Sequence, residues 1–245
     1  MHRHCDAVRE AAGDVPLSRS PNEGVDSRTS WAIGRASAGR PRLGLARCVL
    51  PFLLGTLAAA LVSGLLTRSD RRWAAPTALA TALTGGLAWL FRDPQRVVGQ
   101  GRLLAAADGV VRSIERRPDG RVRVATFMSL LDVHVNRVPI GGTVTSVKYH
   151  PGAHMPAFKE ESERNERMVW MFSTELGDVE VVQIAGILAR RIVPYLEPGT
   201  TVKQGDRLGL IRLGSRVDVY LPAGIEPSVE VGQRTRAGQT RLDRG

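Results

Sequence analysis

Cysteine is nearly absent from this chain. The two cysteines, Cys5 and Cys48, lie in the N-terminal fifth of the 245 residues, so the remainder has no disulfide framework. No Cys-x-x-Cys pair and no histidine-rich cluster indicates a metal site. Aromatic residues make up only 5% of the chain, and no aromatic-rich basic motif of a nucleic-acid-binding module is present. The sequence therefore predicts no metal and no nucleic-acid partner.

Acidic residues are outnumbered by basic ones, which gives a formal net charge of +10. Such a charge favours an anionic partner, either nucleic acid or an anionic lipid surface. Since no nucleic-acid motif is found, an anionic phospholipid membrane is the partner that the composition favours.

Two uncharged apolar runs support a membrane partner. They cover residues 48–67 and 73–91, and about 20 apolar residues are enough to cross a bilayer as a helix. We predict three regions: a disordered extension over 1–46, a hairpin of two membrane helices over 47–92, and a β-rich catalytic domain over 93–245. A buried hairpin of a soluble protein is the alternative.

Arginines flank the two runs and indicate how the hairpin is oriented. Arg40, Arg42 and Arg47 precede the first run, whereas Arg92, Arg96 and Arg102 follow the second. Under the positive-inside rule these residues place both ends of the hairpin in the cytosol, with the catalytic domain on the cytoplasmic side of the cell membrane. A hairpin that enters only one leaflet fits the charges equally well.

After Pro94 the pattern changes to valine-rich alternation, which is typical of short half-buried strands. The predicted strands cover 109–115, 121–127, 133–138, 143–149, 168–174, 179–184, 187–193, 208–213 and 216–221. The fold class is mainly β, a barrel or sandwich. The glycine and valine spacing over 197–209 resembles lipoyl-carrier-like hybrid folds, although no lysine has the hairpin-tip setting that carriers modify.

Three positions could carry chemistry, and each has an ordinary structural interpretation. Asp108 precedes a glycine, and an Asp-Gly pair taken alone is typical of a turn. His134 alternates with valines and, taken alone, is typical of a polar histidine on the protein surface. The Gly214–Ser215 pair interrupts a strand pattern, as a glycine bulge does.

Six motifs in order resemble the phosphatidylserine decarboxylase family, in its short, archaeal-type branch. They are FRDP at 91–94, ADG at 107–109, MSLLDVHVNR at 128–137, NER at 165–167, QIAG at 183–186 with ARRIV at 189–193, and LGSRVD at 213–218. Each motif alone is weak, but their order over some 130 residues is specific. The resemblance covers residues from about 48 to 222.

The resemblance implies a proenzyme that cuts itself between Gly214 and Ser215. The Ser215 hydroxyl would attack the Gly214 carbonyl, and elimination and hydrolysis would convert residue 215 into a pyruvoyl group. The products would be a β chain of residues 1–214 and an α chain of residues 215–245, which stay associated. His134 and Asp108 match the residues that would activate the serine.

The implied reaction converts phosphatidylserine to phosphatidylethanolamine and carbon dioxide through a Schiff base, with His134 as proton donor. Arg137 occupies the place of a second histidine found in the longer branch, which leaves the base for self-cleavage open. Arginines are expected at the substrate's carboxylate and phosphate, and the sequence does not choose among Arg137, Arg190, Arg212 and Arg216. A non-catalytic adaptor, a decarboxylase for another amine, and the monomeric or homo-oligomeric state also stay open.

Overall fold

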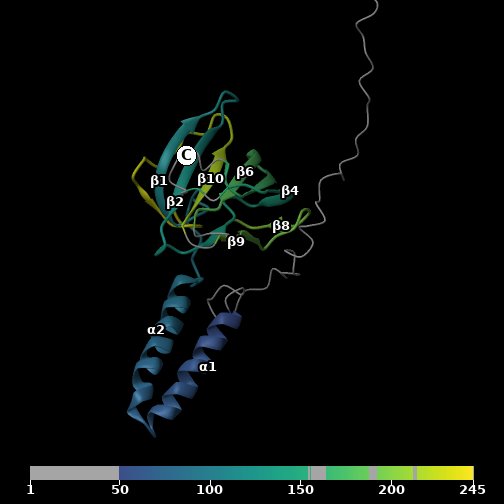
Figure 1. Cartoon of the computed structure of the whole chain (residues 1–245). Coiled ribbons are helices and arrows are strands. Elements are labelled where there is room, and N and C mark those ends of the chain that lie inside the picture. The colour runs from purple at the N-terminus through teal and green to yellow at the C-terminus, as the bar shows by residue number, and fades with distance from the viewer. Residues whose placement is uncertain (1–49, 154, 156–163, 188–191, 212–213, 245) are drawn as a thin grey trace, which may run out of the picture.

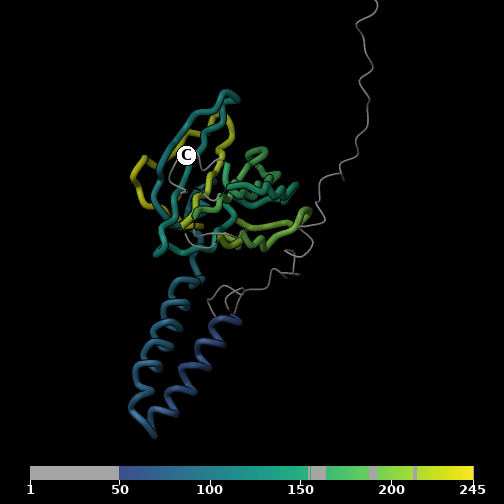
Figure 2. Tube along the Cα trace, in the orientation of Figure 1, coloured from purple at the N-terminus to yellow at the C-terminus, as the bar shows by residue number. Residues whose placement is uncertain are grey.

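The computed structural model describes residues 50–153, 155, 164–187, 192–211 and 214–244. Two apolar helices leave one end of a β-rich domain as a hairpin (Figure 1). The tube view shows that the chain enters the β domain directly from the second helix (Figure 2). The hairpin precedes the β domain in the chain.

The hairpin consists of α1 (Leu50–Thr67), the 3-10 turn η2 (Arg71–Trp73) and α2 (Ala74–Leu90). Asp70 begins the turn by accepting a hydrogen bond from the Arg72 backbone N–H, and the hydroxyls of Thr67 and Thr77 lie 3.0 Å apart between the helices. Among the described residues, α1 alone is long and apolar enough to cross a bilayer, because α2 has 17 residues. That both helices enter the membrane stays a prediction.

The β domain contains one large antiparallel sheet. Its strand order is β11-β1-β2-β10-β6-β5-β4-β8. In chain order these strands are β1 (Gly109–Arg116), β2 (Val122–Met128), β4 (Gly142–His150), β5 (Arg167–Thr174), β6 (Gly177–Ile184), β8 (Thr201–Val202), β10 (Ser215–Leu221) and β11 (Arg234–Thr235). The sheet curls around a core that includes Trp170, Phe172 and Leu221.

A second, three-stranded sheet joins the domain to the helices. It consists of β3 (Val135–Arg137), β7 (Ile192–Pro194) and β9 (Arg207–Ile211), in the order β3-β9-β7. Val133, Val135 and Leu210 of this region form one apolar cluster with Leu53 of α1 and Phe91. The hairpin is therefore packed against the domain at its base.

The predicted mainly β class is confirmed, and most strands lie within two residues of their expected bounds. The strand expected over 133–138 is shorter in the structure, where it is β3 and residues 133 and 134 lie before it. The two-residue strands β8 and β11 were not predicted, since so short a run carries no alternation. Residues 188–191 and 212–213 of two predicted strands lie outside the described residues. A relation to lipoyl-carrier-like folds stays a prediction.

A buried carboxylate fixes the start of the β domain. Asp93 is 1% exposed and forms ion pairs with Arg207 of β9 and, at 3.4 Å, with Arg137 of β3. Arg137 also donates to the carbonyls of Gly205 and Pro94 at 2.9 and 2.8 Å. Arg137 thus serves the internal packing of β3 and β9.

Replacing Asp93 should strongly destabilise the protein. Asp93→Asn removes the charge opposite the buried Arg137 and the half-buried Arg207, and losing one partner of a buried ion pair costs about 3–5 kcal/mol. We expect a clear fall in the midpoint of thermal or urea unfolding. Asp119→Asn, which weakens an exposed pair with Arg121, is the matched control and should change little. Equal midpoints for the two variants would contradict this account.

Candidate active site at the start of strand β10

Ser215 is the first residue of β10, which lies between β2 and β6 in the large sheet. It pairs with Met128, the last residue of β2, and is fully buried. Its Oγ lies 3.4 Å from the Met128 sulfur, a weak acceptor. The interpretation of Ser215 as a surface serine was wrong, because this serine is buried and in register with β2.

Gly214 holds the backbone in a conformation that suits glycine. Its φ is +66°, in the left-handed region, where other residues are disfavoured. A Cβ added at this position would meet no atom within 4 Å. Backbone geometry, and not lack of space, is therefore what glycine satisfies immediately before the serine.

A chain of buried amides orients the sulfur next to Ser215. The Asn136 side-chain amide donates to the Met128 sulfur at 3.4 Å and accepts from Gln183 at 2.7 Å. Gln183 in turn accepts from the Trp170 indole at 2.7 Å. Each of these polar side chains is satisfied by the next, so the surroundings of the serine hydroxyl are rigid.

His134 is fully buried, and neither ring nitrogen has a hydrogen-bond partner in the part of the chain that is described. Burial lowers the pKa of His134, while nearby Asp132 and the more distant charge of Asp108 partly oppose that shift. The His134 carbonyl accepts from the Ile211 backbone at 3.2 Å. The histidine backbone thus lies beside the segment that leads to Gly214, and its imidazole is neutral near pH 7.

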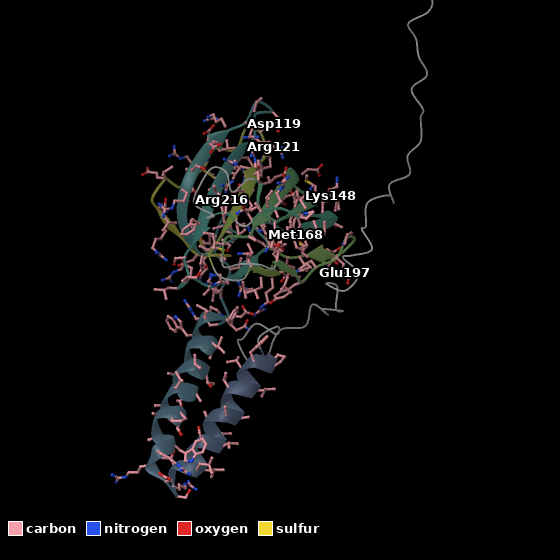
Figure 3. All side chains as sticks on the ribbon, viewed as in Figure 1. Asp119, Arg121, Lys148, Met168, Glu197 and Arg216 are labelled. Carbon is pink, nitrogen blue, oxygen red and sulfur yellow. The ribbon has the colours of Figure 1, made fainter. Side chains whose placement is uncertain are left out.

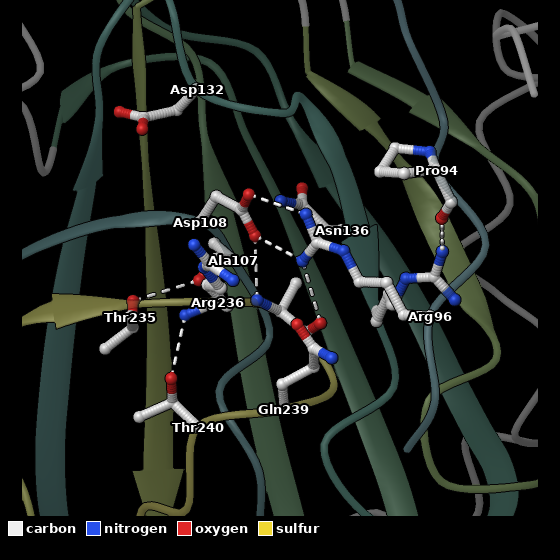
Figure 4. A network of polar contacts seen from close by, with 12 residues as sticks. Pro94, Arg96, Ala107, Asp108, Asp132, Asn136, Thr235, Arg236, Gln239 and Thr240 are labelled. Carbon is white, nitrogen blue, oxygen red and sulfur yellow. Dashed lines mark hydrogen bonds and ion pairs between the residues drawn. The ribbon is translucent and has the colours of Figure 1, made fainter. Parts of the chain in front are cut away.

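Asp108 belongs to a separate polar network (Figure 4). Arg96 donates to both carboxylate oxygens at 2.5 and 2.7 Å, and the Ala237 backbone donates to Oδ1 at 2.8 Å. Gly109 follows with φ +148°, and a Cβ there would lie 2.0 Å from the Phe127 carbonyl oxygen. Asp108 thus lies in a bend directly before β1, which begins at Gly109.

The interpretation of His134 as a surface histidine was wrong, because the valines on both sides and the histidine itself are all buried where β3 meets β9. Of the four candidate substrate arginines, Arg137 is bonded as described above. Arg216 pairs with Asp218 at 2.7 Å inside the sheet and is labelled in Figure 3. Arg190 and Arg212 lie outside the described residues.

Sequence reasoning missed the residues that surround Ser215 and Asp108. Met128, Asn136 and Gln183 all lie within the quoted motifs, which was the available signal. Ala237 lies 129 residues from Asp108 in the sequence, and only the fold brings it beside Asp108 and Arg96. Within the described ranges, no group of three or more histidine, cysteine or acidic residues could hold a metal ion.

The fold and the site define a class: a β-domain protein on an apolar hairpin, with a buried serine after a left-handed glycine and a buried histidine whose ring nitrogens have no partner among the described residues. The family model of phosphatidylserine decarboxylase matches residues 84–243. The chain belongs to the phosphatidylserine decarboxylase family.

Full-length relatives support this assignment. A protein from Streptomyces griseus named phosphatidylserine decarboxylase proenzyme is 59% identical over 209 residues, which cover 85% of this chain and 97% of the relative. One of the same name from Streptomyces coelicolor is 60% identical over 200 residues, 82% of this chain and 92% of the relative. A Halobacterium salinarum protein described as an archaetidylserine decarboxylase proenzyme is 47% identical over 169 residues, 68% and 84% of the two chains.

The buried His134 should make the protein less stable in mild acid. The unfolded chain binds a proton at the ordinary histidine pKa of about 6.5, whereas the native chain binds it only at a lower pH. Stability therefore falls as the pH drops below about 6.5 and stops falling, for this group, below the native pKa. The thermal midpoint of the wild type should fall more steeply between about pH 7 and pH 5 than that of His134→Gln. If the thermal midpoints of the two proteins changed with pH in parallel, the lowered pKa of His134 would be refuted.

Proposed function

We propose that this protein is a self-processing phosphatidylserine decarboxylase in which Ser215 is both the nucleophile of self-cleavage and the source of a covalent pyruvoyl group. Membership of the family supports the reaction, phosphatidylserine to phosphatidylethanolamine and carbon dioxide. The single observation that supports the site is the buried Ser215 directly after the left-handed Gly214.

In the proposed cleavage, the Ser215 Oγ bonds to the Gly214 carbonyl carbon as the peptide C–N bond breaks. The hydroxyl proton passes through His134 to the freed nitrogen. Loss of the residue-215 Cα proton then breaks the new ester, which leaves Gly214 as a carboxylate and residue 215 as dehydroalanine. Uptake of water and loss of ammonia complete the pyruvoyl group. His134 suits this role because its buried imidazole is neutral and has no hydrogen-bond partner among the described residues.

Asp108 is proposed to act through its charge and not as the direct base. Its oxygens bind Arg96 and the Ala237 N–H, and no described hydrogen bond joins it to His134 or Ser215. Its charge nevertheless raises the pKa of His134 against the larger effect of burial. Asp108 is thus a positioning residue that also supports the histidine electrostatically.

The sheet explains how the two products would stay together. β10 pairs with β2 along its whole length and with β6 from Arg216 to Tyr220. The 215–245 product would also keep β11, which pairs with β1. A cut before Ser215 leaves all these ladders intact, so the α chain would remain a strand inside the sheet of the β chain.

When formed, the pyruvoyl group would supply the electron sink for loss of the substrate carboxylate. The chain's own residues would exclude water and deliver protons. Met128 and the Asn136–Gln183 pair hold residue 215 in a buried position. His134 would first take up a proton from solvent on its neutral imidazole and then donate it to the substrate carbon.

The proposed location is the cell membrane, with the β domain on the cytoplasmic side and anionic phospholipid as its surface. The apolar α1 and the net charge of +10 support this location. A non-catalytic adaptor is not proposed, because the full-length relatives are named as decarboxylase proenzymes.

Ser215→Ala should abolish both cleavage and decarboxylation, since alanine has no hydroxyl to attack Gly214. We expect one full-length band on a denaturing gel, where the wild type gives two, and no carbon dioxide from carboxyl-labelled phosphatidylserine. Ser228→Ala, at a half-buried serine of the same predicted fragment that bonds the Arg241 carbonyl, should behave as the wild type. A Ser215→Ala chain that is still cut at this bond would refute the mechanism.

The alternative of another amine substrate is tested separately, by measuring the rate of decarboxylation of the wild-type protein on a panel of serine lipids and free amino acids.

Asp108→Asn separates a charge effect from a direct base. Removing the charge lowers the pKa of His134 further, so the acidic limb of self-cleavage should move to lower pH. Cleavage can be followed by pulse–chase after cell-free synthesis with lipid vesicles. A rate that falls equally at every pH, without displacement of the limb, would instead make Asp108 the base.

A further inference from the structure

Two leucines are exposed next to the buried site. They belong to the leucine turn, residues 129–132, which links β2 to the segment before β3. Leu130 is 44% and Leu131 69% exposed. The turn is held internally, because the Asp132 carboxylate accepts from the Ser129 backbone N–H at 2.8 Å and from its hydroxyl at 2.7 Å. Its polar groups are thus satisfied while both leucines face solvent.

The leucine turn is bonded to the end of the apolar hairpin. Arg92 follows α2 and donates to the Leu131 carbonyl at 2.7 Å and to the Trp89 carbonyl at 2.8 Å. The Arg92 guanidinium also lies 4.1 Å from the centre of the Trp89 ring, and Trp89 is 57% exposed. Tryptophan and arginine at the end of an apolar helix are typical of the lipid headgroup layer. Because Arg92 also bonds the Leu131 carbonyl, it holds Leu131 at the level of this headgroup layer.

The leucine turn also links Met128, the strand partner of Ser215, to His134. It follows Met128, which pairs with Ser215, and precedes His134 by two residues. A second contact fixes its other side, where Arg234 bonds the Asp132 carboxylate. Whatever binds the two leucines therefore binds at the edge of the Ser215 site.

We propose that Leu130 and Leu131 insert into the cytoplasmic leaflet, at the boundary of headgroups and acyl chains, and hold the Ser215 site against the membrane surface. The occupant of this apolar surface is the anionic bilayer itself. Lipid substrate then reaches residue 215 from the plane of the leaflet without leaving it completely. This inference rests on the proposed function for its substrate but not for the membrane contact.

A depth measurement tests the contact without using catalysis. In a Cys5→Ser, Cys48→Ser background, Leu131→Cys carries a nitroxide, and the protein is reconstituted in phosphatidylcholine–phosphatidylglycerol vesicles. Asp119→Cys is the control, because Asp119 lies at the far end of the domain from the helices (Figure 3). We expect the residue-131 label to collide with dioxygen more than with a water-soluble nickel reagent, and the residue-119 label to do the opposite. Two labels with the same aqueous profile would overturn the proposal.

Kinetics give a second, independent test. The double variant Leu130→Ser, Leu131→Ser should still cleave itself, yet act about tenfold more slowly on phosphatidylserine in vesicles. Its rate on monomeric short-chain phosphatidylserine should match that of the wild type. An unchanged vesicle rate, or an equal loss on both substrates, would overturn the proposal. Failure of the proposed function is distinct, since the wild type would then be inactive on both substrates.

Discussion

The antiparallel pairing of β10 with β2 and β6 is the constraint on which the site depends. It places Ser215 opposite Met128 in a fully buried position and leaves Gly214, in a left-handed conformation, just outside the ladder. A serine fixed by a strand on its C-terminal side and preceded by an unusual backbone conformation cannot relax easily. In the proposed mechanism, this asymmetry would direct self-cleavage to the peptide bond between Gly214 and Ser215.

Burial then determines the chemistry of the neighbouring groups. The ring nitrogens of His134 have no hydrogen-bond partner among the described residues, and burial lowers its pKa, so its imidazole is neutral, as the proposed base must be. The surrounding arginines are largely committed to carboxylates: Arg96 to Asp108, and Arg207 to Asp93. These ion pairs connect the segment that follows the apolar hairpin to the β domain.

The sequence was informative wherever a pattern is local. Valine alternation predicted most strands of the large sheet, and the uncharged runs predicted both helices. Burial of His134 was not predictable, because it depends on the pairing of β3 with β9, some 70 residues apart. The Asp108–Arg96–Ala237 network likewise depends on the C-terminal segment folding back beside β1. The resemblance identified Ser215, but only the register with Met128 shows why this serine is held in place.

The central claim is that residue 215 stops being a serine. Intact mass analysis of the purified wild-type protein tests this most directly. The account predicts a fragment that covers residues 215–245 and is lighter by one ammonia than the unmodified peptide, together with a fragment that ends at Gly214. A single full-length species, or a 215–245 fragment with an unmodified serine at its N-terminus, would contradict it.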